Sequence, residues 1–489
     1  MNEPAPVLRG NDYGPLFRID DPEAHLSVSV VIPAHGHQDK LDATLASLAA
    51  QTYPGHLLEV VVVDDGTRPP LRLPEIRPSQ TRLVSPLPGG WSSAHATNSG
   101  AAQSDGEVIL RLDSDMLLFD DHVASQLRWH HKADYLAVLG HKRFVEYAEG
   151  DLDPVAVFDA VRSGKAAELF ETGEGQWIEK IIGSTAGLRE ADHRAFRVLV
   201  GASFSVPRRL FEAAGGMDAD VLLGSDTIFG YRLHQAGAVF VPDDRSSAWH
   251  LGPRQIASRG ELAKRYRRPR IAARVPELDL KRPRASRGWE TPLADVVIHV
   301  GPRDAIVVES CVDAILCGSA PDIRVTLLGD WPEPLTERHA PLDDPDLDAR
   351  LLMESFAGEP RVRFQAAIEV DRRVPYRITM PADATPGPDA VASLVGYANE
   401  FRLGEIEVAL PEGSIRLERK AAAARAAHVG ASIEAVWGSA RVASGPLTEA
   451  FGERFRRVEF DPETPRSGPG DAGVGPKRGK ALVRRLLGR

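Results

Sequence analysis

The sequence contains little cysteine and no long apolar run. Only two of its 489 residues are cysteines, Cys311 and Cys317, which match neither a disulfide framework nor a zinc-ligand set and favour a reducing compartment. No stretch of about 18 consecutive apolar residues occurs, and residues 1–20 lack the basic and apolar regions of a signal peptide. These absences predict a cytoplasmic protein without a membrane-spanning helix.

An excess of positive charge is also missing. The formal net charge is −10, which argues against general nucleic-acid binding because that needs a broad basic surface. Hydrophobic residues make up 43% of the chain and charged residues 26%, as in soluble globular proteins. The chain is too long for one ordinary core, so we expect two domains.

A strand and helix pattern is present near the N-terminus. Residues 27–33 and 57–63 are apolar runs typical of buried strands, and residues 39–51 between them have apolar side chains at helical spacing. Such a βαβ unit predicts a parallel sheet, whose ligands bind beyond the carboxyl ends of the strands. The residues at these ends are Pro33, Ala34 and His35 after the first strand, and Asp64 and Asp65 after the second. We expect them to line one crevice.

A third apolar run, residues 107–112, ends in two carboxylates. Asp113 and Asp115 are two positions apart, so the period of a strand directs them to the same side. Hard divalent cations such as Mg²⁺ and Mn²⁺ bind carboxylate and phosphate oxygens together. The segment therefore predicts a metal that bridges the protein and a diphosphate.

Four further positions allow both a functional and a structural interpretation. Gly90 and Asn98 belong to a glycine pair and a small-residue helix, which either offer amides to an anion or form a turn and a packed helix. Asp226 stands where a helix begins, as a helix cap or as a functional acid. His250 follows a strand, where it is either structural or a third ligand of the metal.

Five segments occur in the order found in family-two glycosyltransferases of the A-type fold, and the chain resembles that family over residues 27–255. The segments are VSVVIPAH (28–35), VVVDDGT (61–67), NSGAAQSDGEVILRLDSDM (98–116), GGMDADVLLGSDTIFGYRLHQAGA (215–238) and SAWHLG (247–252). The fourth is especially similar to the galactosyl- and N-acetylgalactosaminyl-transferase subgroup. The resemblance implies an α/β, Rossmann-like nucleotide-diphospho-sugar transferase fold.

The resemblance also implies roles for individual residues. Those expected to bind the nucleotide sugar are Pro33, Ala34, His35, Asp64, Asp65, Gly90, Asn98, Asp113 and Ser114. Those expected to bind Mn²⁺ or Mg²⁺ are Asp113, Asp115 and His250. Asp226 is expected to be the catalytic base. Two positions depart from the family pattern: Ser225 stands where an acid commonly precedes the base, and Thr97 stands where arginine often precedes Asn98.

These observations predict a metal-dependent, inverting glycosyltransferase. Its expected donor is a nucleotide diphosphate sugar, preferably a UDP-sugar, and its acceptor a hydroxyl of a glycan, a lipid-linked glycan or a natural product. A sugar-phosphate nucleotidyltransferase is an alternative, since it would share the βαβ start and the paired acids. A catalytically inactive nucleotide-sugar or glycan-binding module is another, favoured by Ser225 and opposed by the presence of Asp113, Asp115, Asp226 and His250.

The second half contains signs of an internal repeat. Setting Val296 against Val30 places Asp330 opposite Asp64, since 330 − 296 and 64 − 30 are both 34. Two residues out of step with this match, Pro381 takes the place of Asp113. The interpretation is a degenerate second domain of the same type that supports the first, holds the acceptor or forms a homo-oligomer, and the alternative is an unrelated α/β domain.

The predicted organisation has five parts. They are an irregular arm (1–26), a catalytic domain (27–255), a basic linker or lid (256–292), a degenerate domain (293–462) and a flexible basic tail (463–489). The arginines proposed for a lid over the diphosphate are Arg265, Arg267 and Arg268, although a solvated charge run is equally expected. The tail is either frayed or lies on anionic lipid, which would place the protein peripherally at the inner face of a membrane.

Overall fold

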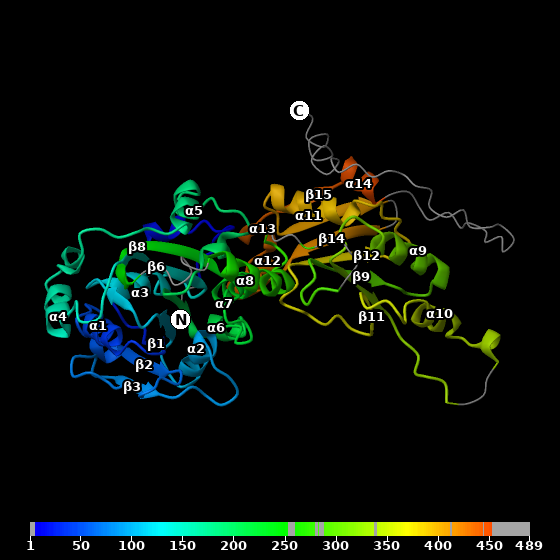
Figure 1. The fold of residues 1–489 in the computed structure, drawn as a ribbon. Coiled ribbons are helices and arrows are strands. Elements are labelled where there is room, and N and C mark those ends of the chain that lie inside the picture. Colours follow the sequence, from blue (N-terminus) through cyan, green and yellow to red (C-terminus); the bar gives the residue numbers. More distant parts are fainter. Residues whose placement is uncertain are drawn as a thin grey trace. The chain divides into compact units, whose positions relative to one another are not determined.

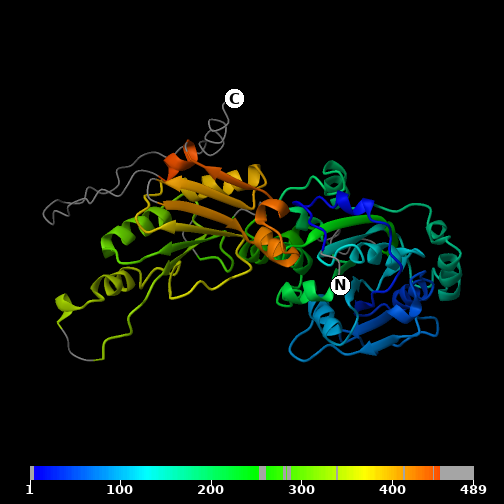
Figure 2. The ribbon, with the colours of Figure 1, turned by 180° about the vertical axis from the view of Figure 1, so that it is seen from behind.

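The computed structural model describes residues 5–252, 260–278, 282, 288–336, 340–410, 413–443 and 445–451. The chain divides into two compact units, which are not contiguous in sequence. The first comprises residues 1–282 and 420–438, and the second comprises residues 283–419 and 439–489. Each unit is built on one sheet with helices packed on it (Figure 1; seen from behind in Figure 2).

An eight-stranded sheet forms the centre of the first unit. In spatial order its strands are β3 (Thr81–Val84), β2 (Leu58–Asp64), β1 (Val28–Ala34), β4 (Val108–Leu112), β7 (Ser203–Pro207), β6 (Leu136–Val145), β8 (Val239–Leu251) and β5 (Met116–Leu118). Strands β1 to β4 are parallel, β7 runs antiparallel to β4 and β6, and β8 is parallel to β6. The carboxyl ends of β1, β2, β4, β6 and β8 therefore lie at one edge of the sheet, as the βαβ pattern predicts.

Helices cover both faces of this sheet, because its strands are apolar on both sides. Val30 and Ile32 pack toward α1 and α3, whereas Val31 packs toward α2, α6 and α7. The helices of this unit before residue 260 are α1 (Gln38–Ala49), α2 (Ser93–Ala102), α3 (His122–His130), α4 (Pro154–Arg162), α5 (Ile178–Ser184), α6 (Arg208–Ala213) and α7 (Ser225–Gln235). Strands that are buried on both faces are typical of parallel sheets.

The N-terminal segment is irregular, as expected, but it packs against the core. Among residues 5–26, Leu8 and Leu16 are fully buried and Tyr13 is nearly so. The Tyr13 hydroxyl donates a hydrogen bond to Gly187 O at 2.5 Å. This segment therefore forms part of the wall of the first unit.

Much of the stretch expected to be a basic linker is a helix. Helix α8 (Gly260–Arg274) belongs to the first unit, with Ile271 and Ala272 buried and Arg274 Nε 3.0 Å from Asp218 Oδ2. The few apolar residues that pack this helix against the first unit are difficult to recognise in the sequence, because arginines surround them. Residues 256–259, 279–281 and 283–287 of the predicted linker lie outside the described residues, as do residues 253–255, residues 452–462 and the whole predicted tail, 463–489.

The second unit contains a seven-stranded sheet. Its topology is that of the first sheet from β3 to β8 in spatial order, without β5. Its strands in spatial order are β11 (Val362–Gln365), β10 (Ile323–Leu328), β9 (Ala294–His299), β12 (Tyr376–Pro381), β14 (Gly413–Arg419), β13 (Glu405–Leu410) and β15 (Ser439–Val442). The order of parallel and antiparallel pairs is identical in the two sheets. Its helices are α9 (Ala305–Leu316), α10 (Leu347–Ser355), α11 (Ala390–Glu400) and α14 (Pro446–Ala450). This agreement supports an internal repeat over an unrelated α/β domain.

The strand registers refine the alignment of the two halves. Val28 pairs with Val108 in the first sheet and Ala294 pairs with Tyr376 in the second, so the fifth residue after each partner is Asp113 or Pro381. The replacement of Asp113 by Pro381 is thus confirmed. The match of Asp330 to Asp64 is wrong by one residue, because β9 and β10 pair with an offset of 29 residues, 323 − 294, whereas β1 and β2 pair with an offset of 30, 58 − 28.

Residues 420–438 complete the first unit from the second half of the sequence. They form α12 (Lys420–Val429) and α13 (Ile433–Val436). Arg425 is buried and donates to Gly237 O and Ala238 O at 2.8 and 2.9 Å, and also to Gly10 O.

Within the described ranges, no helix is long and apolar enough to span a membrane.

Candidate active site

Asp113, Asp115 and His250 form one cluster at the carboxyl edge of the first sheet. The two acids lie between β4 and β5, and His250 lies in β8, where it pairs with Met116 of β5. One ligand atom from each residue lies within 4.8 Å of the others. His250 Nε2 is 3.5 Å from Asp115 Oδ1, while its Nδ1 is buried without a hydrogen-bond partner in the described structure. Two carboxylates and an imidazole with a free nitrogen fit a divalent cation.

The position of His250 follows from an irregularity in β8. The sequence predicts a short strand at residues 239–241, but β8 continues to Leu251. A register shift beside Gly140 and His141 allows the pairing with β6 to resume after a bulge. Because β8 resumes, His250 stands on a strand facing the acids rather than on a loop.

The pKa values of the three candidate ligands are shifted in different directions. Burial, followed by the charge of Asp113, raises the pKa of Asp115 to about 7. Burial also acts to raise the pKa of Asp113, but the Arg111 guanidinium, 2.7 Å from its Oδ1, and the other nearby positive charges, including Lys142, together outweigh burial and hold that pKa below its usual value. Burial lowers the pKa of His250 to about 4, so its imidazole is neutral near pH 7. A cation at this place would favour the ionised form of both acids.

Two buried cations beneath the acids escaped the sequence analysis. Arg111 lies in β4 and Lys142 in β6, and each is 5% exposed. Lys142 Nζ donates to Gly201 O at 2.9 Å, and burial lowers its pKa to about 8 although Asp113 opposes this shift. The sequence does show a basic residue within each of these two apolar strands. That pattern could have indicated a buried cation with a charged partner, since a buried charge is expected to have one.

Asp226 is connected to the same group. It lies in the first turn of α7, whose N-cap is Gly224, so it is not the cap itself. Its Oδ2 accepts from Gly201 N at 3.1 Å and its Oδ1 from Thr227 N at 2.8 Å. The backbone of one residue, Gly201, thus bonds to both side chains: its N–H donates to Asp226 and its carbonyl accepts from Lys142.

Asp64 and Asp65 shape the loops beyond β2. Asp64 accepts from Thr67 N at 2.9 Å and from Leu71 N at 3.0 Å. Burial acts to raise the pKa of Asp64, but the Thr67 side chain together with these two backbone hydrogen bonds outweighs burial, and the net shift of the pKa is downward. Asp65 Oδ2 accepts from Ser92 N at 3.0 Å, which ties the end of β2 to the start of α2.

The smaller residues of the predicted donor site lie around these acids. Pro33 and Ala34 are buried at the end of β1, and His35 Nδ1 is 3.0 Å from Asp65 O. Ser114 O accepts from Thr44 Oγ1 at 3.0 Å. Gly90 precedes α2, and a Cβ added there would lie 3.1 Å from His95 Nδ1.

Asn98 is hydrogen-bonded to the protein at both ends of its side chain. Its Nδ2 donates to Met217 O at 2.8 Å and its Oδ1 accepts from Met217 N at 2.9 Å. The amide thereby fixes the turn at Gly215 and Gly216. The nucleotide contact of Asn98 stays a prediction, although both ends of this side chain already have a protein partner.

Comparison with known proteins agrees with the motif order. Residues 29–193 match the family model described as glycosyl transferase family 2. The chain is 24% identical over 374 residues to a hyaluronan synthase of Pasteurella multocida, covering 70% of this chain and 36% of that protein. It is 29% identical over 223 residues to a validoxylamine A glucosyltransferase of Streptomyces hygroscopicus subsp. limoneus, covering 43% and 48%. The chain thus spans less than half the length of these relatives.

Solved structures with some likeness include a mannosyltransferase from Pyrobaculum calidifontis in complex with GDP-Man and Mn²⁺. It is 18% identical, with a TM-score of 0.36, and the match covers 56% of this chain and 69% of that one. The family model over residues 29–193, the named relatives and the sheet topology together support a family-two glycosyltransferase domain of the A-type fold in the first unit.

Proposed function

We propose that this glycosyltransferase is metal-dependent and inverting. It moves a sugar from a nucleoside diphosphate, preferably UDP, to a hydroxyl of a glycan, a lipid-linked glycan or a natural product. The observation that carries the proposal is the cluster of Asp113, Asp115 and His250 within 4.8 Å, with Asp226 linked to the neighbouring Lys142 through the backbone of Gly201. The cluster binds the metal and Asp226 acts as the base.

The metal-binding role rests on the chemistry of the three ligands. Asp113 and Asp115 supply carboxylate oxygens, and His250 is neutral near pH 7 and so has a free lone pair. When bound, Mn²⁺ or Mg²⁺ would neutralise charge on the departing diphosphate. Arg111 compensates the charge of Asp113, to which it is paired at 2.7 Å.

Asp226 takes the proton of the acceptor hydroxyl. Single displacement with inversion requires a carboxylate on the side of the anomeric carbon opposite to the leaving group. Two backbone amides orient the Asp226 carboxylate, while each oxygen retains a lone pair for the acceptor. Both properties suit a positioned general base.

The donor nucleoside lies against the loops after β1 and β2. His35, Asp64, Asp65 and Gly90 are close to one another there, and Asp64 retains acceptor capacity for a base N–H. Relatives named hyaluronan synthase and chondroitin synthase, each 24% identical, support a glycan acceptor.

The second unit is a degenerate copy with a supporting role. At the place of Asp113 it has Pro381, and Asp383, at the place of Asp115, is 3.4 Å from Arg303 Nη2. One carboxylate at this place offers fewer oxygen ligands than the pair in the first unit, which disfavours a divalent metal ion there. We therefore assign the chemistry to the first unit.

The test is turnover with a panel of UDP- and GDP-sugars, with Mn²⁺ and with EDTA. Metal-dependent hydrolysis or transfer from one donor supports the proposal. Release of pyrophosphate from UTP and a sugar 1-phosphate would instead support a nucleotidyltransferase. Metal-dependent binding of a nucleotide sugar without turnover would support the inactive module.

A further inference from the structure

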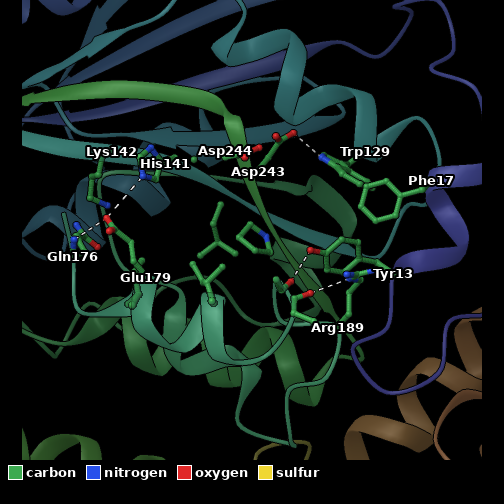
Figure 3. Close-up of a pocket in the computed structure, with 18 of the residues that line it drawn as sticks. Tyr13, Phe17, Trp129, His141, Lys142, Gln176, Glu179, Arg189, Asp243 and Asp244 are labelled. Atoms are coloured by element: carbon green, nitrogen blue, oxygen red, sulfur yellow. Dashed lines mark hydrogen bonds and ion pairs between the residues drawn. The ribbon is translucent and has the colours of Figure 1, made fainter. Parts of the chain in front are cut away.

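A cavity of about 480 Å³ lies in the first unit (Figure 3). Its walls come from the N-terminal segment, from the bulged edge of β6 and β8, and from residues 176–189. This volume is typical of small-molecule sites. Of the active-site group, Lys142 lines the cavity, whereas Asp113, Asp115, Asp226 and His250 do not.

One end of the cavity is aromatic. Phe17 is 60% exposed and lies with its ring centroid 5.5 Å from that of Trp129 and 5.9 Å from that of Tyr13. Arg189 lies over the Phe17 ring, 5.8 Å from its centroid. A large exposed ring on a cavity wall offers a face for the apolar side of a ligand ring.

The other end is polar. In Figure 3, Gln176, Glu179 and His141 lie away from the aromatic group. Glu179 Oε1 accepts from Gln176 N at 2.8 Å and is 3.8 Å from His141 Nε2, while Asp244 is exposed on the bulge of β8. Amide, carboxylate and imidazole groups around one cavity suit a ligand with several hydroxyls.

The charges of the lining cancel. Arg128, Lys142 and Arg189 face three carboxylates, Glu179, Asp243 and Asp244. Asp243 is already paired with Arg128 at 2.9 Å and accepts from Trp129 Nε1 at 2.7 Å. The lining therefore provides no net attraction for a charged ligand.

We propose that this cavity binds an uncharged sugar residue of the acceptor, next to the residue that receives the transferred sugar. The proposal rests on the proposed function. Lys142 connects the two places, because it lines the cavity and its hydrogen bond to Gly201 O leads to Asp226. The preferred acceptor therefore contains at least two sugar residues, and the N-terminal segment contributes to its selection.

The test is saturation-transfer NMR on the full chain with UDP and Mn²⁺ present. The probes are the methyl glycosides of glucose, galactose, N-acetylglucosamine and N-acetylgalactosamine, with methyl glucuronide as the charged comparison. At least one uncharged glycoside should bind, and Phe17→Ala and Gln176→Ala should each weaken it about tenfold. Phe401→Ala, at a 45% exposed phenylalanine of the second unit, is the matched control and should change nothing.

UDP affinity in Mn²⁺ separates this inference from the proposed function. It should be the same in the parent chain and in the three variants. Loss of glycoside binding with UDP binding intact is the expected result for Phe17→Ala and Gln176→Ala. Absence of binding by all four uncharged glycosides, binding that survives both variants, or tighter binding of the glucuronide would each overturn the inference. Absence of UDP binding in the parent chain would instead count against the proposed function.

Discussion

Lys142 and Asp226 are joined through one residue, Gly201. Lys142 Nζ donates to Gly201 O at 2.9 Å, and Gly201 N donates to Asp226 Oδ2 at 3.1 Å. A buried ammonium thus supports the geometry of the proposed base while its charge lies near Asp113. Lys142 is a positioning residue in this arrangement, since it acts on Asp226 through Gly201.

Replacing Lys142 should therefore reduce turnover rather than metal binding. In Lys142→Met, Gly201 O loses its donor and Asp226 loses its support, so kcat should fall about 10- to 100-fold. Mn²⁺ affinity should not fall, because removing a positive charge beside two carboxylates favours a cation. Steady-state kinetics and Mn²⁺ titration provide the two readouts, with the exposed Lys180→Met as control. An unchanged kcat would rule out this role.

His250→Ala should weaken Mn²⁺ binding. The variant removes one of three ligands within 4.8 Å and leaves two carboxylates of like charge. The dissociation constant for Mn²⁺ should rise at least about tenfold, measured by electron paramagnetic resonance of free Mn²⁺. His56→Ala, at an exposed histidine, is the matched control. Equal Mn²⁺ affinity in both variants would mean that His250 is structural.

Asn98→Ala should reduce stability and leave UDP affinity nearly unchanged. The substitution removes two hydrogen bonds to Met217 and changes no other group that is proposed to contact the nucleotide. Urea unfolding should show a loss of about 2 kcal/mol. If UDP binding fell sharply while the unfolding midpoint stayed constant, Asn98 would be a nucleotide ligand after all.

Arg425→Met should destabilise the first unit even though the residue lies late in the sequence. The side chain is buried, stacks 5.0 Å from the Trp437 ring centroid, and donates to carbonyls of Gly237 and Ala238. Its loss leaves buried carbonyls without donors, at a cost of about 3 kcal/mol in urea unfolding. The exposed Arg441→Met should have no measurable effect, and equal stability of the two variants would contradict the assignment of residues 420–438 to the first unit.

Stability should decrease on acidification below pH 6.5. Burial lowers the pKa of His122 to about 4 and that of His130 to about 3, so both are neutral in the folded chain. In the unfolded chain both histidines have the ordinary pKa of 6.5 and become protonated as the pH falls below that value. The free energy of unfolding therefore decreases as the pH falls from 6.5 to about 4. Each histidine contributes about 1.4 kcal/mol per pH unit there. Urea unfolding from pH 7.5 to 4.5 should show a smaller slope in His122→Gln, and an identical slope would refute this cause.

The fold was predictable where the pattern of side chains is local. The apolar runs at residues 27–33, 57–63 and 107–112 predict β1, β2 and β4, and the order of strands places Asp64 and Asp113 at one edge. The long β8 was not predictable, because its bulge beside Gly140 depends on pairing with β6. Helix α8 was not predicted, because its many arginines make the segment resemble a solvated basic run and only a few residues, among them Ile271 and Ala272, are apolar and buried.

The candidate site was predictable for the residues that lie at strand ends. Asp113, Asp115 and His250 do come together. Asn98 follows the same motif pattern, but a sequence does not reveal that its amide is taken by Met217, which lies 119 residues later. Lys142 was missed because its relation to Asp226 depends on a backbone carbonyl, which every residue has.

Calorimetric titration of UDP into the parent chain and into Asp115→Asn, each with Mn²⁺ and with EDTA, tests the central claim most directly. The account predicts that Mn²⁺ tightens UDP binding to the parent at least about tenfold and that Asp115→Asn loses most of this gain. Asp383→Asn, at the corresponding place in the second unit, should bind UDP as the parent does. Equal UDP affinity with Mn²⁺ and with EDTA in the parent chain would contradict the metal-bridged donor site.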